Sequence, residues 1–317
     1  MILSISIAAV ADQPFVHDCL DSIEAQTTAE HEIHLVTNGC SQIFLDRLGR
    51  QHPQVELISY PARRSFAENH NEVMRQCDSE YLLLLNDDTV ILDGALDRML
   101  DFLESQPSEV GIVGCTNLTG SGEFALSCHP FPDASVIISQ HAMLGRLLSG
   151  RGYQRYLKQA RGTEPFPVDW VQGSCILIRR EVIKRIGYLD EAFFLFSEEV
   201  DYCYRARCAG FVVCQVPRAQ IVHYDSTTTH RFVPLKLRGH YLGKMYFLAK
   251  HGFIWDLRLV RAWFVAELLV KSAIRGAGVL VGYPSDAKER LQAYLDLIGI
   301  CATYRGQPAA QLVSQEN

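Results

Sequence analysis

Residues 1–115 alternate between two patterns of hydrophobic and polar positions. Short apolar runs predict buried strands at 2–9, 32–36, 55–60, 81–85 and 110–115. Between these runs, apolar residues at helical spacing predict helices at 15–26, 41–50, 66–77 and 92–105. This βαβα order predicts an α/β fold, with a doubly wound, mainly parallel sheet and helices on both of its faces.

Beyond Thr116 the pattern is less regular. The stretch 135–158 could be helical and could form a mobile flap. Further strands and short helices are predicted within 168–180, 180–187, 198–209, 211–216 and 220–224. From Leu235 onward the spacing is almost entirely helical. The sequence therefore predicts one main domain over residues 1–230, followed by a C-terminal helical extension over residues 231–317.

The composition is that of an ordinary globular chain. Of its 317 residues, 48% are hydrophobic and 21% are charged, and the formal net charge is -6. A nucleic-acid binder would normally be basic, so we expect no nucleic-acid partner. The ten cysteines form no CxxC pair and mostly lie in apolar stretches, which favours free thiols in a reducing compartment. We find no secretion signal and no spanning run, and we expect a cytoplasmic protein.

Three polar residues, Asn86, Asp87 and Asp88, end the apolar run at 81–85 abruptly. In open α/β sheets, ligands bind just beyond the carboxyl ends of such strands. Two adjacent carboxylates repel each other unless a cation lies beside them. Hard oxygen ligands suit Mg²⁺ or Mn²⁺, and these ions suit a diphosphate. The alternative is that both acids only cap a turn or the next helix.

A second acidic group follows the aromatic-rich run at 193–196. If Ser197 caps the next helix, Glu198 and Glu199 lie in its first turn. These acids could serve only the helix dipole. However, an aromatic wall beside a carboxylate raises its pKa by desolvation, which is how a protein prepares a general base for neutral pH.

His223 lies at the end of another apolar strand. A histidine there is more often a satisfied core residue than a ligand. Its imidazole could nevertheless complete a divalent-metal site begun by a carboxylate elsewhere in the chain. Spacing alone leaves both interpretations open.

Six segments, in chain order, resemble motifs of the inverting glycosyltransferases of family 2, which have the GT-A fold, and particularly of its rhamnosyltransferase-like members. The resemblance covers about residues 2–252. Each motif is weak alone, but six in the right order make a strong signal. The segments are the opening strand and helix, SFAENHN at 65–71, LNDDT at 85–89, VDWVQGS at 168–174, GYLDE with FFLFSEEVD at 187–201, and PRA with VH at 217–223.

The resemblance implies a metal-assisted transfer with inversion, from a nucleoside-diphosphate sugar to a hydroxyl of a saccharide or lipid-linked acceptor. It assigns Asp88 and His223 to a divalent cation, Mg²⁺ or Mn²⁺. Glu199 would be the general base, with Glu198 as the second choice. Trp170 and Gly173 would shape the pocket for the acceptor and the sugar. The donor would contact Ala9, Thr37, Arg64, Ser65, Asn71, Asn86 and Asp87.

The sequence departs from the family pattern at several donor positions. Thr37 stands where an acid normally contacts the nucleotide base, and Ser65 stands where glycine is usual. Asn86 takes the first position of the DXD motif, which is often an acid. Next to the donor loop, Arg63 and Arg64 could offset diphosphate charge or could simply be solvated.

Two other classes of function compete with transfer. Because of these departures, the chain could be a degenerate sugar-nucleotide-binding or scaffolding protein without transfer activity. A nucleotidyltransferase also uses a metal on an α/β sheet, but it would be expected to have a glycine-rich, basic loop after the first strand. Residues 9–14 have neither feature.

The C-terminal stretch 257–281 is apolar except for five charged residues. Three of them, Glu267, Lys271 and Arg275, recur every four positions and form one polar stripe. The remaining surface of this helix should be buried, on the main domain or in a homodimer. The other interpretation is a peripheral contact with the cytoplasmic face of a membrane, which Trp263 and the basic residues would suit.

Overall fold

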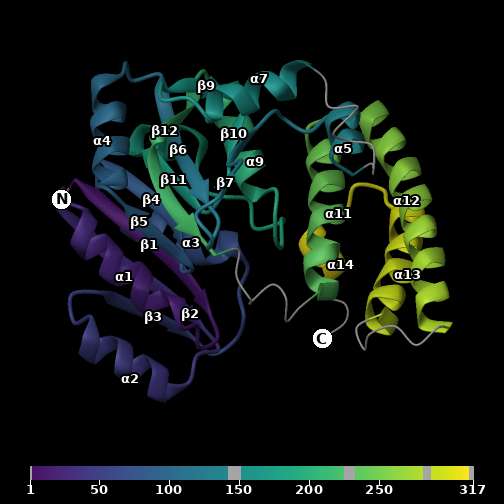
Figure 1. Cartoon of the computed structure of the whole chain (residues 1–317), viewed down its shortest axis with the longest axis horizontal. Coiled ribbons are helices and arrows are strands. Elements are labelled where there is room, and N and C mark those ends of the chain that lie inside the picture. The colour runs from purple at the N-terminus through teal and green to yellow at the C-terminus, as the bar shows by residue number, and fades with distance from the viewer. Residues whose placement is uncertain (1, 142–150, 225–232, 281–286, 314–317) are drawn as a thin grey trace. The chain divides into compact units, whose positions relative to one another are not determined.

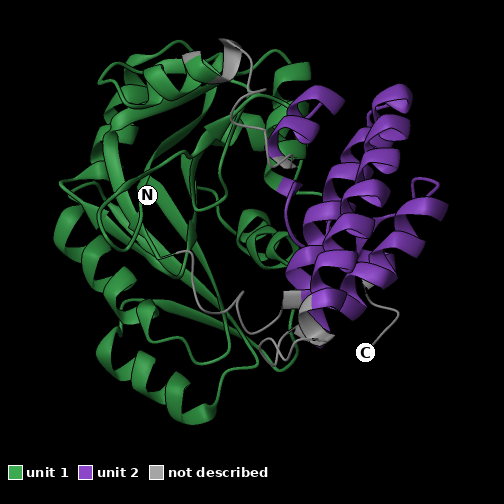
Figure 2. Ribbon diagram, turned by 45° about the vertical axis from the view of Figure 1, so that its right-hand side comes forward, with its two compact units in different colours: residues 1–131, 151–190, 199–228 green, residues 132–150, 191–198, 229–317 purple. Residues whose placement is uncertain are grey.

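The computed structural model describes residues 2–141, 151–224, 233–280 and 287–313 (Figure 1). The chain divides into two compact units (Figure 2). Unit 1 comprises residues 1–131, 151–190 and 199–228, and unit 2 comprises residues 132–150, 191–198 and 229–317. The chain passes from unit 1 to unit 2 for the last time after residue 228, close to the predicted boundary at 230. Two earlier segments, 132–150 and 191–198, also belong to unit 2.

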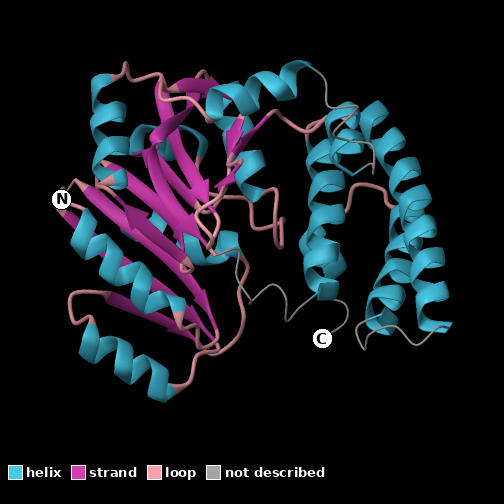
Figure 3. Cartoon of the chain, viewed as in Figure 1, coloured by secondary structure: helices cyan, strands magenta, loops and turns pink. Residues whose placement is uncertain are grey.

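A mixed, mostly parallel sheet forms the centre of unit 1 (Figure 3). Its main strands are β1 (Leu3–Val10), β2 (His31–Asn38), β3 (Glu56–Tyr60), β4 (Tyr81–Asn86), β5 (Thr89–Leu92), β6 (Val110–Leu118), β11 (Cys175–Arg179) and β12 (Val212–His223). They lie in the order β3-β2-β1-β4-β11-β6-β12-β5. Strands β1 to β4 run parallel, as do β6 and β12, while β11 is antiparallel to both of its neighbours.

Four short strands complete the β-structure. β7 (Phe124–Ala125) pairs with β6, and β9 (Phe166–Val168) pairs with β12. β8 (Cys128–His129) and β10 (Trp170–Val171) form a separate two-stranded sheet. This small sheet carries Trp170, one of the predicted acceptor residues.

Helices cover both faces of the large sheet, as predicted. One face packs on α1 (Phe15–Gln26), α2 (Gln42–Gln51) and α4 (Ala95–Ser105), and the other on α3 (Phe66–Gln76), α8 (Arg180–Ile186) and α9 (Glu198–Cys208). The cause is the alternation of side chains along each strand. In β4, for example, Leu83 and Leu85 enter one core while Leu82 and Leu84 enter the other. Two separate apolar layers therefore hold the fold together.

The strand order reverses next to β1. The chain runs outward through β1, β2 and β3, and then returns to place β4 on the other side of β1. Such a switch point leaves a crevice beyond the carboxyl ends of the two strands, where α/β proteins bind ligands. Val10 and Asn86 end the two strands at this point.

The predicted elements differ from the structure in two places. The helix predicted at 92–105 begins only at Ala95, because Thr89–Leu92 forms the edge strand β5, antiparallel to β12. The two strands predicted around Pro217 form one strand, β12, with an irregular register between Val216 and Gln220 where proline is tolerated. In the stretch 135–158, α5 (Ala134–His141) and α7 (Arg151–Ala160) are helical, while 142–150, and with it the flap prediction, lies outside the described residues.

Unit 2 is built from helices, as predicted. They are α5, α11 (Val233–Lys250), α12 (Ile254–Leu280), α13 (Ala287–Thr303) and α14 (Ala309–Val313). α12 packs on α13 and also on α5 and α11. Phe264 and Leu268 of α12 are fully buried. Within the described ranges, no helix has the length and apolar character needed to cross a membrane.

Candidate active site

The segment after β4 and the end of β12 meet at one edge of the sheet. The backbone N–H of Tyr224 donates to the carbonyl of Asp88 at 3.0 Å, and His223 pairs with Thr89 across the two strands. This pairing brings together residues that are far apart in the sequence. Asp88 is buried, and His223 is half-buried.

The two predicted metal ligands lie within direct reach of each other. Nε2 of His223 is 3.3 Å from Oδ1 of Asp88 and 3.1 Å from Nδ2 of Asn86. Two neighbouring ligands of an octahedral Mg²⁺ or Mn²⁺ ion, at about 2.1 Å from the metal, are about 3 Å apart. The oxygen and the nitrogen therefore fit adjacent positions on one ion, and a donor diphosphate and water would have to supply the others.

Asp87 lies beside this pair and is half-buried. Burial, together with the neighbouring charge of Asp88, raises its pKa well above the ordinary range of an aspartate. A cation, or a hydrogen-bond donor from a ligand, would stabilise the charged form of Asp87 and lower this pKa. The raised pKa means that the negative charge of Asp87 is disfavoured in its present surroundings.

Glu199 is brought to the same end of the sheet through the segment before β11. The backbone N–H of Asn86 donates to the carbonyl of Ser174 at 3.0 Å. Next to Ser174, a Cβ on Gly173 would lie 3.9 Å from both Cβ and Cγ of Glu199 and 3.4 Å from the Phe66 ring. These are ordinary van der Waals distances, so the side chains of Glu199 and Phe66 both lie against the backbone at Gly173. Glu199 therefore lies beside the strand-end segment and is not separated from it by the sheet.

Helix α9, which carries Glu199, is anchored by its own polar side chains. Asp201 is fully buried and pairs with Arg205 at 2.8 Å. Arg205 also donates to the carbonyls of Ile186 and Tyr188, at 2.8 Å and 2.7 Å. These bonds fix the orientation of the first turns of α9.

Glu198 is also buried and directly precedes Glu199 in the first turn of α9. Successive residues of a helix differ by about 100° in direction, so the two glutamates cannot both face Gly173. Just before them, Phe196 and Ser197 have positive φ angles of 68° and 77°, a rare conformation for residues with side chains. The geometry thus separates the two candidate bases and favours Glu199.

Close packing within unit 2 holds this strained segment. A Cβ on Gly239 of α11 would lie 2.7 Å from the carbonyl oxygen of Leu195, and one on Gly243 would lie 2.6 Å from that of Phe196. The Phe196 ring also stacks on His240, with ring centroids 3.9 Å apart. The C-terminal helices therefore shape the segment from which α9 starts.

Trp170 is half-buried in the two-stranded sheet. Its indole N–H donates to the carbonyl of Pro130 at 2.9 Å, and its ring stacks on His129 with centroids 4.7 Å apart. Two residues further on, Gln172 accepts a hydrogen bond from Asn117 at 2.9 Å. Trp170 and Gly173 thus lie on the same short segment, on either side of Val171 and Gln172.

The first two strands place the predicted donor residues Ala9 and Thr37 close to their carboxyl ends. Ala9 is fully buried, and its carbonyl accepts a hydrogen bond from Asn38 Nδ2 at 3.2 Å. Thr37 is buried, and its hydroxyl lies 2.8 Å from that of Ser59. Asn38 also accepts from the backbone N–H of Arg64 at 3.1 Å. Asn38 therefore ties the end of β2 to the start of the predicted donor loop.

Three predicted donor residues have partners within the protein. Asn71 donates to the carbonyl of Leu189 and accepts from its N–H, both at 2.9 Å, so it holds the 189 segment, and its donor contact stays a prediction. Ser65 caps α3 in a reciprocal capping box with Glu68. The Arg64 guanidinium pairs with Glu72 at 3.4 Å and lies 3.9 Å from the centre of the Tyr60 ring. The donor contacts of Ser65 and Arg64 stay predictions beside these structural roles.

Two residues at strand ends were not singled out from the sequence. They are Asn38, described above, and Asn117 on β6, whose Nδ2 donates to Gln172 and to Ser174 at 2.8 Å. Both are buried polar residues close to the carboxyl end of a parallel strand. Asp88 was selected because it is a polar residue at the carboxyl end of a buried strand. Asn38 and Asn117 share this feature, so the sequence could have identified them.

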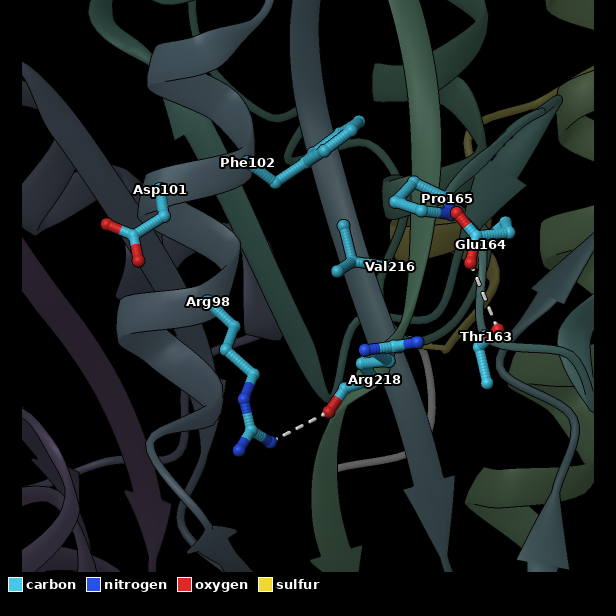
Figure 4. A pocket seen from close by; sticks show the side chains of 8 residues that line it. All are labelled: Arg98, Asp101, Phe102, Thr163, Glu164, Pro165, Val216 and Arg218. Carbon is cyan, nitrogen blue, oxygen red and sulfur yellow. Dashed lines mark hydrogen bonds between the residues drawn. The ribbon is translucent and has the colours of Figure 1, made fainter.

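A separate groove of about 450 Å³ lies beside α4 and β12 (Figure 4). Arg98 crosses to β12 by donating to the carbonyl of Arg218 at 3.0 Å. The lining residues are Arg98, Asp101, Phe102, Thr163, Glu164, Pro165, Val216 and Arg218. None of them is a predicted site residue, so this groove is distinct from the Asp88 edge.

Comparison with known proteins identifies the class. A family model described as "Glycosyltransferase like family 2" matches residues 3–241. The chain therefore belongs to glycosyltransferase family 2 and is a glycosyltransferase, as the motifs predicted.

Individual relatives agree with this class. The chain is 25% identical to the N-acetylglucosaminyl-diphospho-decaprenol L-rhamnosyltransferase of Mycobacterium tuberculosis H37Rv, over 83% of this chain and 91% of that protein. It is 22% identical to the rhamnosyltransferase WbbL of Escherichia coli K12, over 78% of this chain and 92% of that protein. Among solved structures, it is similar to the mannosyltransferase PcManGT from Pyrobaculum calidifontis in complex with GDP-Man and Mn²⁺, with a TM-score of 0.54 and 15% identity over 95% of this chain and 87% of that chain. This last likeness concerns the fold, which is of the GT-A type.

Proposed function

We propose that the chain transfers a hexose or deoxyhexose, such as rhamnose, from a nucleoside-diphosphate sugar to a hydroxyl group, with inversion and with a divalent cation. The observation that carries the proposal is the meeting of three groups at one end of the sheet. Asp88 and His223 lie 3.3 Å apart, and Glu199 lies against Gly173, next to the Ser174 carbonyl that binds Asn86.

Glu199 is the general base of this proposal. Its carboxylate takes the proton of the acceptor hydroxyl as that oxygen attacks the anomeric carbon, while the bond from this carbon to the diphosphate breaks. Attack on one face with departure from the other inverts the configuration. A positioned base contributes about 10²–10⁴-fold to such a rate.

The leaving diphosphate belongs at the Asp88 edge. Asp88 and His223 would hold a Mg²⁺ or Mn²⁺ ion there, and that ion would neutralise the charge of the departing diphosphate. Asn86 and Asp87, on the same turn, would contact the sugar or the diphosphate. The buried strand ends at Ala9 and Thr37 would line the nucleotide side, and Asn38 would position that side through Arg64 N.

The acceptor class is the finer part of the proposal. Trp170 and Gly173 offer an aromatic surface and a backbone position next to Glu199 on one short segment. The name of the mycobacterial relative specifies a sugar carried on a polyprenyl diphosphate. We therefore propose a saccharide linked to a lipid diphosphate as the acceptor.

One face of α12 supports this acceptor class. The exposed side chains of this helix are almost all apolar, with exposed fractions of 74% for Trp255, 58% for Leu259 and 63% for Ile274. Arg258 lies among them, with its guanidinium 4.9 Å from the centre of the Trp255 ring. Tryptophan and arginine beside an apolar helix face suit a membrane interface. We propose that this face rests on the lipid surface that carries the acceptor.

The membrane contact can be tested with vesicles of phosphatidylcholine and phosphatidylglycerol. The full chain should float with the vesicles, and Trp255→Glu combined with Ile274→Glu should abolish flotation. A matched control is Ile43→Glu, because Ile43 is 81% exposed on unit 1. A stable dimer in light scattering that the α12 variant converts to monomers, with no flotation of the wild type, would instead assign this face to a second copy of the chain.

The transfer itself is tested with a panel of nucleotide sugars. Specific donors should raise the thermal midpoint in the presence of Mn²⁺, by mass action. Nucleoside diphosphate should then be released when a lipid-linked saccharide is added, and a chelator should stop the release. Donor binding without release on any acceptor of this class would favour the alternative, a binding protein that has lost transfer.

A further inference from the structure

A second cluster of metal-binding side chains lies beneath α3. Glu32 and His34 are two residues apart on β2, so they project from the same face of the sheet. Cys77, the C-cap residue of α3, meets them from the helix side. The cluster lies about 13 Å before the end of β2, four residues at roughly 3.3 Å each. It is therefore separate from the Asp88 edge.

The three side chains converge on one point. Oε1 of Glu32 is 3.2 Å and Sγ of Cys77 is 3.3 Å from the same atom, Nε2 of His34, and all three ligand atoms lie within 4.8 Å of one another. Ligand atoms of a tetrahedral zinc site are about 3.3–3.7 Å apart, given bonds of about 2.0–2.3 Å. Across the ranges that the structure describes, no other three His, Cys, Asp or Glu side chains come together in this way.

Neighbouring strands support two of the three residues. Nδ1, the other ring nitrogen of His34, lies 2.9 Å from Oε2 of Glu56 on β3. The hydroxyl of Ser4 on β1 donates to Oε1 of Glu32 at 2.5 Å. Metal-bound histidines commonly turn their second nitrogen toward a carboxylate, which fixes the ring and its tautomer. In this cluster the Glu56 carboxylate lies within hydrogen-bonding distance of Nδ1, although the geometry is not that of a hydrogen bond.

The local charges favour a cation at this point. The carboxylates of Glu32 and Glu56 lie 3.2 Å and 2.9 Å from the two ring nitrogens of His34, so negative charge is concentrated beside this imidazole. His34 and Cys77 are buried, while the side chains of Glu32 and Glu56 are 34% and 59% exposed. The two glutamates therefore give an ion a route from solvent.

We propose that Glu32, His34 and Cys77 bind one Zn²⁺ ion, with water as the fourth ligand. A thiolate with an imidazole selects zinc over Mg²⁺ or Mn²⁺, so this ion differs from the one proposed at Asp88. The zinc links β2 to the end of α3. Because α3 also carries Asn71, which holds the 189 segment, the ion braces the helix that supports the donor side of the fold.

The test uses the full chain, stripped of metal with a chelator and then equilibrated with zinc in an excess of Mg²⁺. One zinc per chain should be retained, and zinc should raise the thermal midpoint. Co²⁺ in place of zinc should give a sulfur-to-cobalt charge-transfer band. Cys77→Ser should lose the band and the zinc. The control is Cys301→Ser, which removes a buried thiol of unit 2 and should bind zinc as the wild type does.

A second variant tests the zinc site if Cys77→Ser fails to fold. Glu56→Gln changes a surface residue that touches only the second nitrogen of His34, and it should weaken zinc binding by about 10–100-fold. Wild-type protein that retains no zinc under these conditions would overturn the proposal. So would zinc that stays in Cys77→Ser and disappears in Asp88→Asn, because the ion would then sit at the other site.

Discussion

Two groups of polar side chains on the same sheet have opposite surroundings. On α3, two buried polar side chains have partners within the protein. Ser6 lies 2.8 Å from His70 Nδ1, and Asn71 bonds to both the N–H and the carbonyl of Leu189. At the edge beyond β4, by contrast, Asp87 and Asp88 lie next to each other, and burial with mutual repulsion raises the pKa of Asp87.

The difference is between side chains with partners inside the protein and two adjacent carboxylates, which we propose bind a ligand. A buried polar group with internal partners adds rigidity and specificity, and removing its partner costs stability. A group of like charges left beside each other costs stability unless a ligand compensates it. Similar residue types therefore serve different purposes on two parts of one sheet, and four predictions test this division, beginning with the largest effect.

Glu199→Gln should reduce turnover by about 10²–10⁴-fold, because the amide cannot take the acceptor proton. Donor affinity, measured by calorimetry with Mn²⁺, should stay at the wild-type value. The matched control is Glu181→Gln, which changes an exposed acid in the first turn of α8. Loss of both donor binding and turnover would show that Glu199 holds the fold and is not the general base.

Asp88→Asn should lower transfer by about 10²–10³-fold, since the site would lose a charged ligand worth several kcal/mol in the transition state. A Mn²⁺ titration of donor binding should shift to much higher metal concentration. Asp78→Asn is the control, because that side chain is 99% exposed. Cys77→Ser should leave the Mn²⁺ titration unchanged, and a shift there would show that the two groups are not independent.

Asn71→Ala should lower the free energy of unfolding by about 2–5 kcal/mol, because it leaves a buried N–H and a buried carbonyl of Leu189 without partners. Denaturant titration measures this loss. Gln76→Ala, an exposed change on the same helix, should stay within about 0.5 kcal/mol of the wild type. If Asn71→Ala instead keeps its stability and loses donor affinity, Asn71 binds the donor and does not hold the fold.

His70 should make stability depend on pH. Burial lowers the pKa of this fully buried imidazole from 6.5 to about 3, so between these values the unfolded chain binds a proton that the folded chain does not. Its contribution should therefore be complete above pH 6.5 and fall by about 1.4 kcal/mol per pH unit below it. Denaturant titrations at pH 7.5 and 5.5 should show this fall in the wild type, and equal pH dependence in His70→Gln would contradict it.

Regular periodicity made the first half of the fold predictable. The helix at 15–26 and the strand beginning at Tyr81 appear where the sequence placed them, because each element buries a continuous apolar stripe or run. The edge strand Thr89–Leu92 was not predicted, since its pairing with β12 involves residues distant in the sequence. The proline of β12 was misread for the same reason, because a register shift is visible only against a neighbouring strand.

For the site, the sequence by itself determined the class of protein and the identity of Asp88, His223 and Glu199 as candidates, because polar residues at strand ends and helix starts are local signals. Only the tertiary structure decided that Nε2 of His223 lies 3.3 Å from Asp88. It also decided that Asn71 and Arg64 have partners within the protein, and that Glu32, His34 and Cys77 share one point. The physical reason is that these contacts join different strands and helices, and local hydrophobic pattern sets each element but not which of its side chains face one another across the fold.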